Sequence, residues 1–227
     1  MRVPLIIWVA VWAQLLPPLA AARRWRSLDR AHRGIAAWVA LLLAMDLTQL
    51  VWTRVLAFGS NIILEYAYVP LQGALILLVL AEWQVQTVAR NTVRFLVPLA
   101  LVWWAVTTAF FEDTSNFSVL SSPVIGLLAL AAALLAFVTR LQDEEVPVLR
   151  TSWCWILAGV AIHFATNSTI SIFQAVVTAR QDWAMLARAL EFKAGIDIFA
   201  IICITGGFLW TDPPRSSGAS SLPAHSR

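Results

Sequence analysis

The sequence predicts an all-α fold, namely a polytopic integral membrane protein with seven transmembrane helices. Of its 227 residues, 60% are hydrophobic and 13% are charged, and this charged fraction is about half that of a typical soluble domain. The hydrophobic residues also gather in runs of about 20 residues, the length that a helix needs to cross a bilayer. We therefore predict a transmembrane domain at residues 1–210, followed by a disordered, Pro-, Ser- and Gly-rich cytoplasmic tail at residues 211–227.

The first hydrophobic run, at residues 4–22, precedes a cluster of arginines. A signal peptide has its positive charge before its hydrophobic segment, so we interpret this run as a retained transmembrane helix that Pro17 and Pro18 interrupt. We expect the last two helices to extend into the connector between them, because that connector is compatible with helix throughout. Short polar connectors separate the remaining predicted helices, at residues 34–57, 61–83, 95–111, 121–140, 152–177 and 189–210.

The segment 121–140 differs from the other predicted helices because it carries no polar side chain at membrane depth. Small and apolar residues of this kind either face lipid or allow helices to approach closely. We therefore expect this helix to be either a lipid-facing helix or a tightly packed one.

The distribution of basic residues predicts the orientation of the chain. Cytoplasmic loops of membrane proteins are enriched in Lys and Arg, and an arginine cluster directly follows the first predicted helix. This places the N-terminus outside and the C-terminus in the cytoplasm of a cell membrane, which we expect to be a bacterial inner membrane. Because the arginines act as a topology signal, the basic pI of about 9.4 does not predict nucleic-acid binding. In this orientation 11 of the 16 basic residues are cytoplasmic and five are not, namely Arg2, Arg54, Arg180, Arg188 and Lys193.

Polar and ionisable side chains occur inside four of the predicted helices, in the half that this orientation places outside. His163, Asn167, Ser171 and Gln174 follow one another at helical spacing in the segment 152–177. An ionisable group in hydrocarbon costs at least roughly 2.5–3.5 kcal/mol, so such groups are expected to face one another or a water-filled pocket. We predict a polar cavity that opens to the extracytoplasmic side above an apolar floor. The predicted ligand-binding residues are Asp46, Gln49, Glu65, Gln72, His163, Asn167, Ser171, Lys193 and Asp197.

A structural role explains part of the same pattern. Amides and hydroxyls often hold membrane helices together, at about 0.6 kcal/mol for each interaction. Lys193 and Asp197 have the spacing of an ion pair within one helix. Asp46 and His163 would then pair with each other, and the sequence leaves this alternative open.

The sequence contains no catalytic motif and no clear cofactor motif. Retinal proteins have their Schiff-base lysine near the middle of the seventh helix, one turn after an aspartate. Here Ile201 follows Asp197 at that offset and Lys193 lies near the helix end, which argues against retinal. A zinc site needs three or four His, Cys or carboxylate ligands, and no metal-binding spacing is present. A single imidazole can hold the metal of a haem or chlorophyll-type ring, so a pigment on His163 stays an open alternative.

Two functional interpretations remain. In the first, the chain is a non-enzymatic accessory or scaffolding subunit that acts through a membrane protein partner in the lipid bilayer. The short loops without an output domain favour this interpretation. In the second, it is a receptor-like ligand-binding or transport protein that uses the polar cavity. The clustering of polar groups in one half of the predicted bundle favours this second interpretation.

Overall fold

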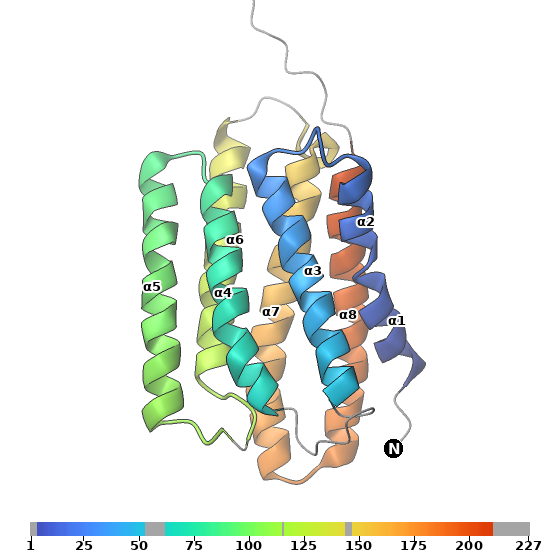
Figure 1. The fold of residues 1–227 in the computed structure, drawn as a ribbon, viewed down its shortest axis with the longest axis vertical. Coiled ribbons are helices and arrows are strands. Elements are labelled where there is room, and N and C mark those ends of the chain that lie inside the picture. The colour runs from blue at the N-terminus through green and yellow to red at the C-terminus, as the bar shows by residue number, and fades with distance from the viewer. Residues whose placement is uncertain (1–3, 53–61, 115, 144–146, 211–227) are drawn as a thin grey trace, which may run out of the picture.

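A computed structural model describes residues 4–52, 62–114, 116–143 and 147–210, and these residues form helices and no strand (Figure 1). Seven described segments are long and apolar enough to cross a membrane, with α1 and α2 together forming the first. By helix length and composition, the prediction of an all-helical, multi-pass membrane protein is thus confirmed. The helices are α1 (Leu5–Ala13), α2 (Leu16–Arg23), α3 (Arg30–Leu50), α4 (Ile62–Trp83), α5 (Thr87–Phe110), α6 (Ser121–Asp143), α7 (Ser152–Ala179) and α8 (Trp183–Leu209), with a short 3-10 turn, η2 (Val148–Arg150), before α7.

Helices α3, α5 and α8 begin earlier than their hydrophobic runs predict, within the connectors that precede them, whereas α6 and α7 begin at their predicted residues. Helix α3 begins at Arg30 instead of residue 34, since the Asp29 carboxylate accepts the backbone N–H of His32 at 2.8 Å and so caps the helix. Helix α5 begins at Thr87 instead of residue 95. Helix α8 begins at Trp183, which matches the expected extension into the connector.

Two of the sequence predictions fall outside the described residues. The predicted end of the second helix, at residues 53–57, is one of them, and the tail at residues 211–227 is the other. Both stay predictions.

The first membrane segment is broken between α1 and α2, as Pro17 and Pro18 suggest. Neither proline has an N–H group, so the carbonyls of Ala13 and Gln14 lose their helical partners. Helix α1 consequently leans away from the direction of α2 (Figure 1). Gln14 ends α1 at this break, and its side chain becomes important for the site described below.

A second proline is accommodated by a neighbouring helix. Pro70 lies inside α4 and cannot donate to the carbonyl of Tyr66, one turn earlier. The indole Nε1–H of Trp104 on α5 donates to that carbonyl at 3.0 Å. The backbone group that the proline leaves free therefore ties α4 to α5.

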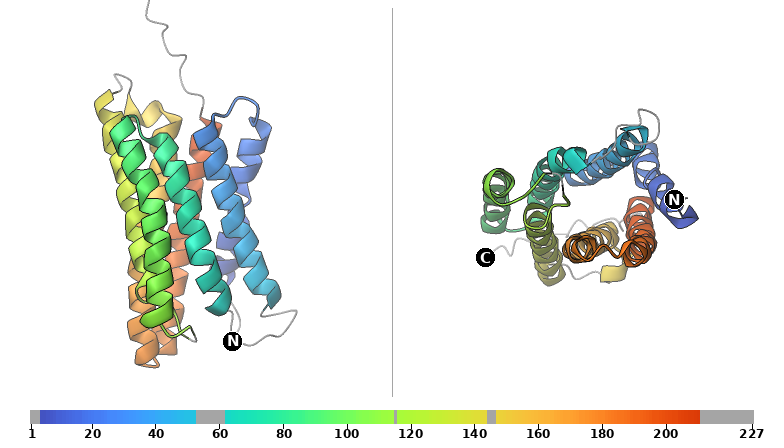
Figure 2. Two further views of the ribbon diagram at one scale, coloured as in Figure 1. Left: turned by 60° about the vertical axis from the view of Figure 1, so that its left-hand side comes forward. Right: turned by 90° about the horizontal axis from the view of Figure 1, so that it is seen from below.

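The helices form a bundle in which α7 packs most extensively against α8 and α6, and α5 packs mainly against α4 and α6. Seen from below, α3 and α4 lie on one side, α7 and α8 lie on the other, and α1 lies at the edge (Figure 2). Helix α6 has one tightly packed face and one exposed apolar face, so both features that its sequence suggested are present, with Leu127, Leu134 and Val138 on the exposed side. Its buried face consists largely of alanines, Ala129, Ala132, Ala133 and Ala136, each at most 2% exposed.

One half of the bundle is filled by large apolar side chains, and we call it the packed half. It contains the first half of α3 and α7 and the second half of α4 and α8. Gly207 lets α8 approach α7 closely there, since a Cβ atom at this position would lie 2.8 Å from the carbonyl oxygen of Ser152. The most completely buried large side chains of the packed half are Ile35, Trp38, Ile76, Leu77, Leu80, Trp83, Ile156, Leu157, Ile204 and Phe208.

Candidate functional site

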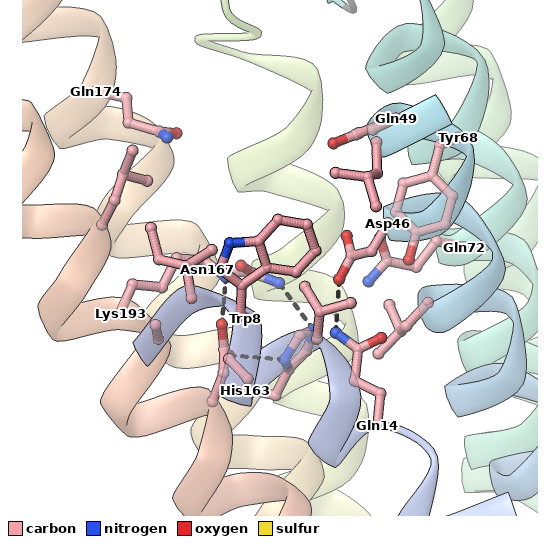
Figure 3. A pocket seen from close by; sticks show the side chains of 18 residues that line it. Trp8, Gln14, Asp46, Gln49, Tyr68, Gln72, His163, Asn167, Gln174 and Lys193 are labelled. Atoms are coloured by element: carbon pink, nitrogen blue, oxygen red, sulfur yellow. Dashed lines mark hydrogen bonds and ion pairs between the residues drawn. The ribbon is translucent and has the colours of Figure 1, made fainter. Parts of the chain in front are cut away.

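The opposite half of the bundle, which we call the cavity half, contains a cavity of about 540 Å³. This is within the usual range for small-molecule sites, roughly 300–1,000 Å³. Residues of α1, α3, α4, α7 and α8 line it, and the lining extends to Leu50 at the end of α3. The polar residues that line it are Gln14, Asp46, Gln49, Tyr68, Gln72, His163, Asn167, Gln174, Lys193 and Asp197 (Figure 3).

One wall of the cavity carries a hydrogen-bonded network between α7 and α8. The Asp197 carboxylate accepts from Lys193 Nζ at 2.5 Å through one oxygen. Its other oxygen lies 3.1 Å from Nδ1 of His163. The amide nitrogen of Asn167 lies 2.8 Å from Nε2 of the same imidazole. The negative charge of Asp197 is therefore balanced by a cation and supported by the imidazole.

The geometry of this network selects one form of His163. Because the Asn167 amide nitrogen donates, Nε2 must accept, and a neutral imidazole then has its hydrogen on Nδ1. That hydrogen points to Asp197. The ring is 8% exposed and packs edge-on against Trp38, with 5.3 Å between ring centroids. His163 thus lies at the boundary between the cavity and the packed half.

The opposite wall carries a second, separate pair. Gln14 Nε2 donates to one carboxylate oxygen of Asp46 at 2.7 Å. Among the described residues, no cationic side chain makes an ion pair with Asp46. Two buried polar atoms beside it, the amide oxygen of Gln14 and the hydroxyl of Tyr68, have no hydrogen-bond partner in the part of the chain that the structure describes. Figure 3 shows Asp46, Tyr68 and Gln72 on this wall, facing Lys193 and Asn167 across the cavity.

Seven of the nine predicted site residues line the cavity: Asp46, Gln49, Gln72, His163, Asn167, Lys193 and Asp197. Ser171 does not, since its hydroxyl donates to the carbonyl of Asn167 at 2.9 Å along its own helix. Glu65 does not either, since it lies in the first turn of α4, near Glu112 in the loop between α5 and α6. Whether the seven residues bind a ligand stays a prediction.

Glu112 itself has a structural role. Its carboxylate accepts the backbone N–H groups of Leu120 and Ser121 at 2.6 and 3.1 Å, together with the hydroxyls of Ser118 and Ser121. It thus caps the start of α6 from the preceding loop. Partial burial raises the pKa of Glu112, but these hydrogen bonds outweigh it and leave the pKa below its usual value.

The pairing of Asp46 with His163, considered from the sequence, is not what the structure contains. Both ring nitrogens of His163 are engaged by Asp197 and Asn167, and Asp46 is bonded to Gln14. The sequence indicated that these polar groups were at similar depth, but not which helix faces which.

Several lining residues escaped the sequence-based site. Gln14 and Trp8 come from α1, a helix with little that is polar, and Tyr68 comes from α4. Gln174 was part of the predicted stripe but not of the predicted site. The break at Pro17 is the one signal that could have drawn attention to Gln14, because a helix end inside a membrane needs polar partners.

The arrangement also bears on the metal and pigment alternatives. Among the described residues, no group of three or more His, Cys, Asp or Glu side chains has the geometry of a metal site. A haem or chlorophyll-type ring on His163 would have to displace Asn167 from Nε2 or Asp197 from Nδ1. Lys193, the candidate lysine for retinal, is engaged by Asp197.

Comparison of the chain with protein-family models, with curated proteins and with solved structures gives no match. The functional argument therefore depends on the geometry of the cavity.

Proposed function

We propose that this protein binds a small polar molecule in the cavity between Asp46 on α3 and the Lys193–Asp197 pair on α8. The observation that carries the proposal is that the cavity is large enough for such a molecule and that its wall holds Asp46, a carboxylate without an ion-pair partner among the described residues, beside Gln14 Oε1 and Tyr68 Oη. A carboxylate used only to hold helices together would be expected to pair with a cation. The geometry therefore supports the ligand-binding interpretation better than the accessory-subunit interpretation.

The arginines after the first membrane segment support the proposed orientation. With the N-terminus outside, the cavity half faces the extracytoplasmic side, so the ligand enters from there. Cys154 and Cys203 are buried, which allows single cysteines to be tested with a membrane-impermeant thiol reagent. We expect Asn116→Cys, in the loop beside the cavity half, to react in intact cells and Leu149→Cys, at the other end, to react only after lysis. The reverse pattern would contradict the orientation.

The binding proposal can be tested by purifying the protein from its host in mild detergent and identifying co-eluting small molecules by mass spectrometry. Ala194 lines the cavity and is 6% exposed, so Ala194→Phe fills the cavity from α8. Ala10→Phe does so from α1. Ala105→Phe, on the exposed face of α5, is the control. We expect a molecule that co-elutes with the wild type and the control but not with the two filled variants. A molecule retained by all four proteins, or by none, would count against binding in the cavity.

The accessory-subunit interpretation remains a second candidate because of α5. This helix packs mainly against α4 and α6, and one of its faces carries exposed apolar side chains: Val88, Phe95, Leu99, Val102, Val106 and Phe110. Lipid or a partner helix can cover such a face. A membrane protein that co-elutes stoichiometrically with the wild type, and is lost from Leu99→Trp but not from the cavity-filled variants, would support this second candidate.

A further inference from the structure

We infer that the ligand of this cavity carries a protonated amine, whose ammonium group binds to the Asp46 carboxylate. This inference depends on the proposed function, because it specifies the chemical class of molecule that the cavity accepts. The charges on the two walls of the cavity differ. Asp197 is paired with Lys193 and His163, whereas the one hydrogen-bond partner of Asp46 among the described residues is the neutral amide of Gln14. The charge that the cavity leaves without a counterion is therefore negative.

The hydrogen-bonding atoms around Asp46 favour the same class of ligand. Gln14 uses its amide nitrogen for Asp46, and its unpartnered atom is the oxygen, an acceptor. The Asp46 carboxylate can accept further hydrogen bonds, since one such bond is provided by the described residues. An ammonium group has three donors and no acceptor. It can therefore donate to Asp46 and to Gln14 Oε1 at once, which a hydroxyl or a carboxylate of the ligand could not do.

The aromatic and aliphatic side chains that line the cavity can contact the apolar part of such an amine. Trp8 and Tyr68 line the cavity together with the aliphatic side chains of Ile7, Leu42 and Leu50. Figure 3 places the Trp8 indole across the cavity from Tyr68. Aromatic faces attract organic cations within about 6 Å, and apolar walls accept the hydrocarbon part of an amine. The lining thus suits a cation with an apolar or aromatic body.

Other charged ligands fit the cavity less well. An anion would have to compete with Asp197 for Lys193 and would be repelled by Asp46. A hard metal ion such as Ca²⁺ takes 6–8 oxygen ligands, commonly including several carboxylates. Asp46 is the one carboxylate on its wall among the described lining residues. An organic ammonium needs only one carboxylate and a few further acceptors.

The experiment uses molecules that share one skeleton and differ in charge. The probes are tryptamine, tryptophol and indole-3-propionate, and the phenethyl series of amine, alcohol and carboxylate, applied to the purified wild-type protein. Binding is measured by the shift in thermal unfolding and by isothermal calorimetry. We expect the amines to bind at least about tenfold more tightly than their alcohols, since a hydrogen bond to a charged group has this effect, and the carboxylates to bind most weakly.

Two matched variants test whether Asp46 is responsible. Asp46→Asn removes the charge but keeps an oxygen that accepts from Gln14, so the fold should be preserved, as checked by circular dichroism and gel filtration. It should remove the preference for amines over alcohols. Glu65→Gln changes a carboxylate in the first turn of α4, outside the cavity, and should keep the preference. Equal loss of preference in both variants would overturn the assignment to Asp46.

The possible failures can be told apart. If alcohols or carboxylates bind as tightly as amines, and Ala194→Phe removes that binding, the cavity is a ligand site but the ammonium inference is wrong. If no probe binds and no molecule co-purifies, the proposed function itself is wrong. The amine can come from water or from the headgroup of an aminophospholipid. Weaker tryptamine binding in phosphatidylglycerol nanodiscs that also contain phosphatidylethanolamine would identify the lipid, and unchanged binding would identify a soluble amine.

Discussion

In the packed half of the bundle, Trp38, Trp83 and Phe208 are at most 1% exposed and fill the space among the helices. In the cavity half, the same helices surround a space of about 540 Å³ lined by charged and amide side chains. The contrast separates two roles. Close packing in one half stabilises the bundle, and the other half holds the cavity that we propose as a ligand site.

The two walls of the cavity differ in how their carboxylates are paired. Removing the better-paired carboxylate should give the largest change in the free energy of unfolding. Asp197→Ala leaves Lys193 without its counterion in a largely buried position, so we expect a loss of about 3 kcal/mol in the free energy of unfolding. Asp46→Ala removes one bond to a neutral amide and should cost about 1 kcal/mol. Chemical unfolding in mixed micelles measures both values. Equal costs would indicate a single shared network and would contradict the separation of the two walls.

Glycines test the difference in packing between the halves. Gly207→Ala brings a Cβ atom to 2.8 Å from the Ser152 carbonyl oxygen in the packed half, so we expect a loss of about 2 kcal/mol. Gly195→Ala in the cavity half places its Cβ 3.8 Å from Ile6, and Gly206→Ala meets nothing within 4 Å. Both should be neutral or slightly stabilising, because alanine favours helix over glycine. Thermal unfolding in detergent measures all three, and a destabilised Gly206→Ala would weaken the packing argument.

The loop beside the cavity half provides a test through pH. Glu112→Gln weakens the cap of α6 and should cost roughly 1–2 kcal/mol at neutral pH. Because the pKa of Glu112 is lowered in the folded protein, its stabilisation is present above the usual Glu value of about 4.3 and is lost as the pH falls further. The melting temperature of the wild type should therefore fall more steeply than that of Glu112→Gln between about pH 5 and pH 3. The control is Asp113→Asn, at the exposed neighbouring residue, which should keep the pH profile of the wild type. An identical pH profile for Glu112→Gln and the wild type would refute the role of Glu112.

The smallest expected effect concerns the contact between α4 and α5. Trp104→Phe removes the indole bond to the Tyr66 carbonyl and should cost about 1 kcal/mol. In a Pro70→Ala background, residue 70 gains an N–H that can donate to the same carbonyl, so the cost of Trp104→Phe should be smaller there. A double-mutant cycle measures the coupling. The same cost in both backgrounds would show that the indole bond does not compensate for the proline.

The candidate site was only partly predictable from the sequence. Its polar residues could be found because an ionisable group at membrane depth stands out in an apolar segment. Their partners could not be found, because pairing depends on how each helix is rotated and tilted against its neighbours. His163 therefore pairs with Asp197 instead of Asp46, and Glu65 lies outside the cavity despite its suitable depth. Gln14 was overlooked because its helix was otherwise apolar.

The helical class and the seven membrane-length segments follow from the sequence alone, since hydrophobicity is a local property and the bilayer sets the length that a spanning helix needs. The break before Pro17 could also be predicted, because two successive prolines leave the carbonyls of Ala13 and Gln14 without backbone N–H partners. The tertiary structure decided that α1 joins the cavity wall and that Asp46 faces Gln14 while Asp197 faces Lys193 and His163. The physical reason is that hydrogen bonds and ion pairs act over a few ångströms, and only packing between helices that are distant in sequence brings these side chains within that range.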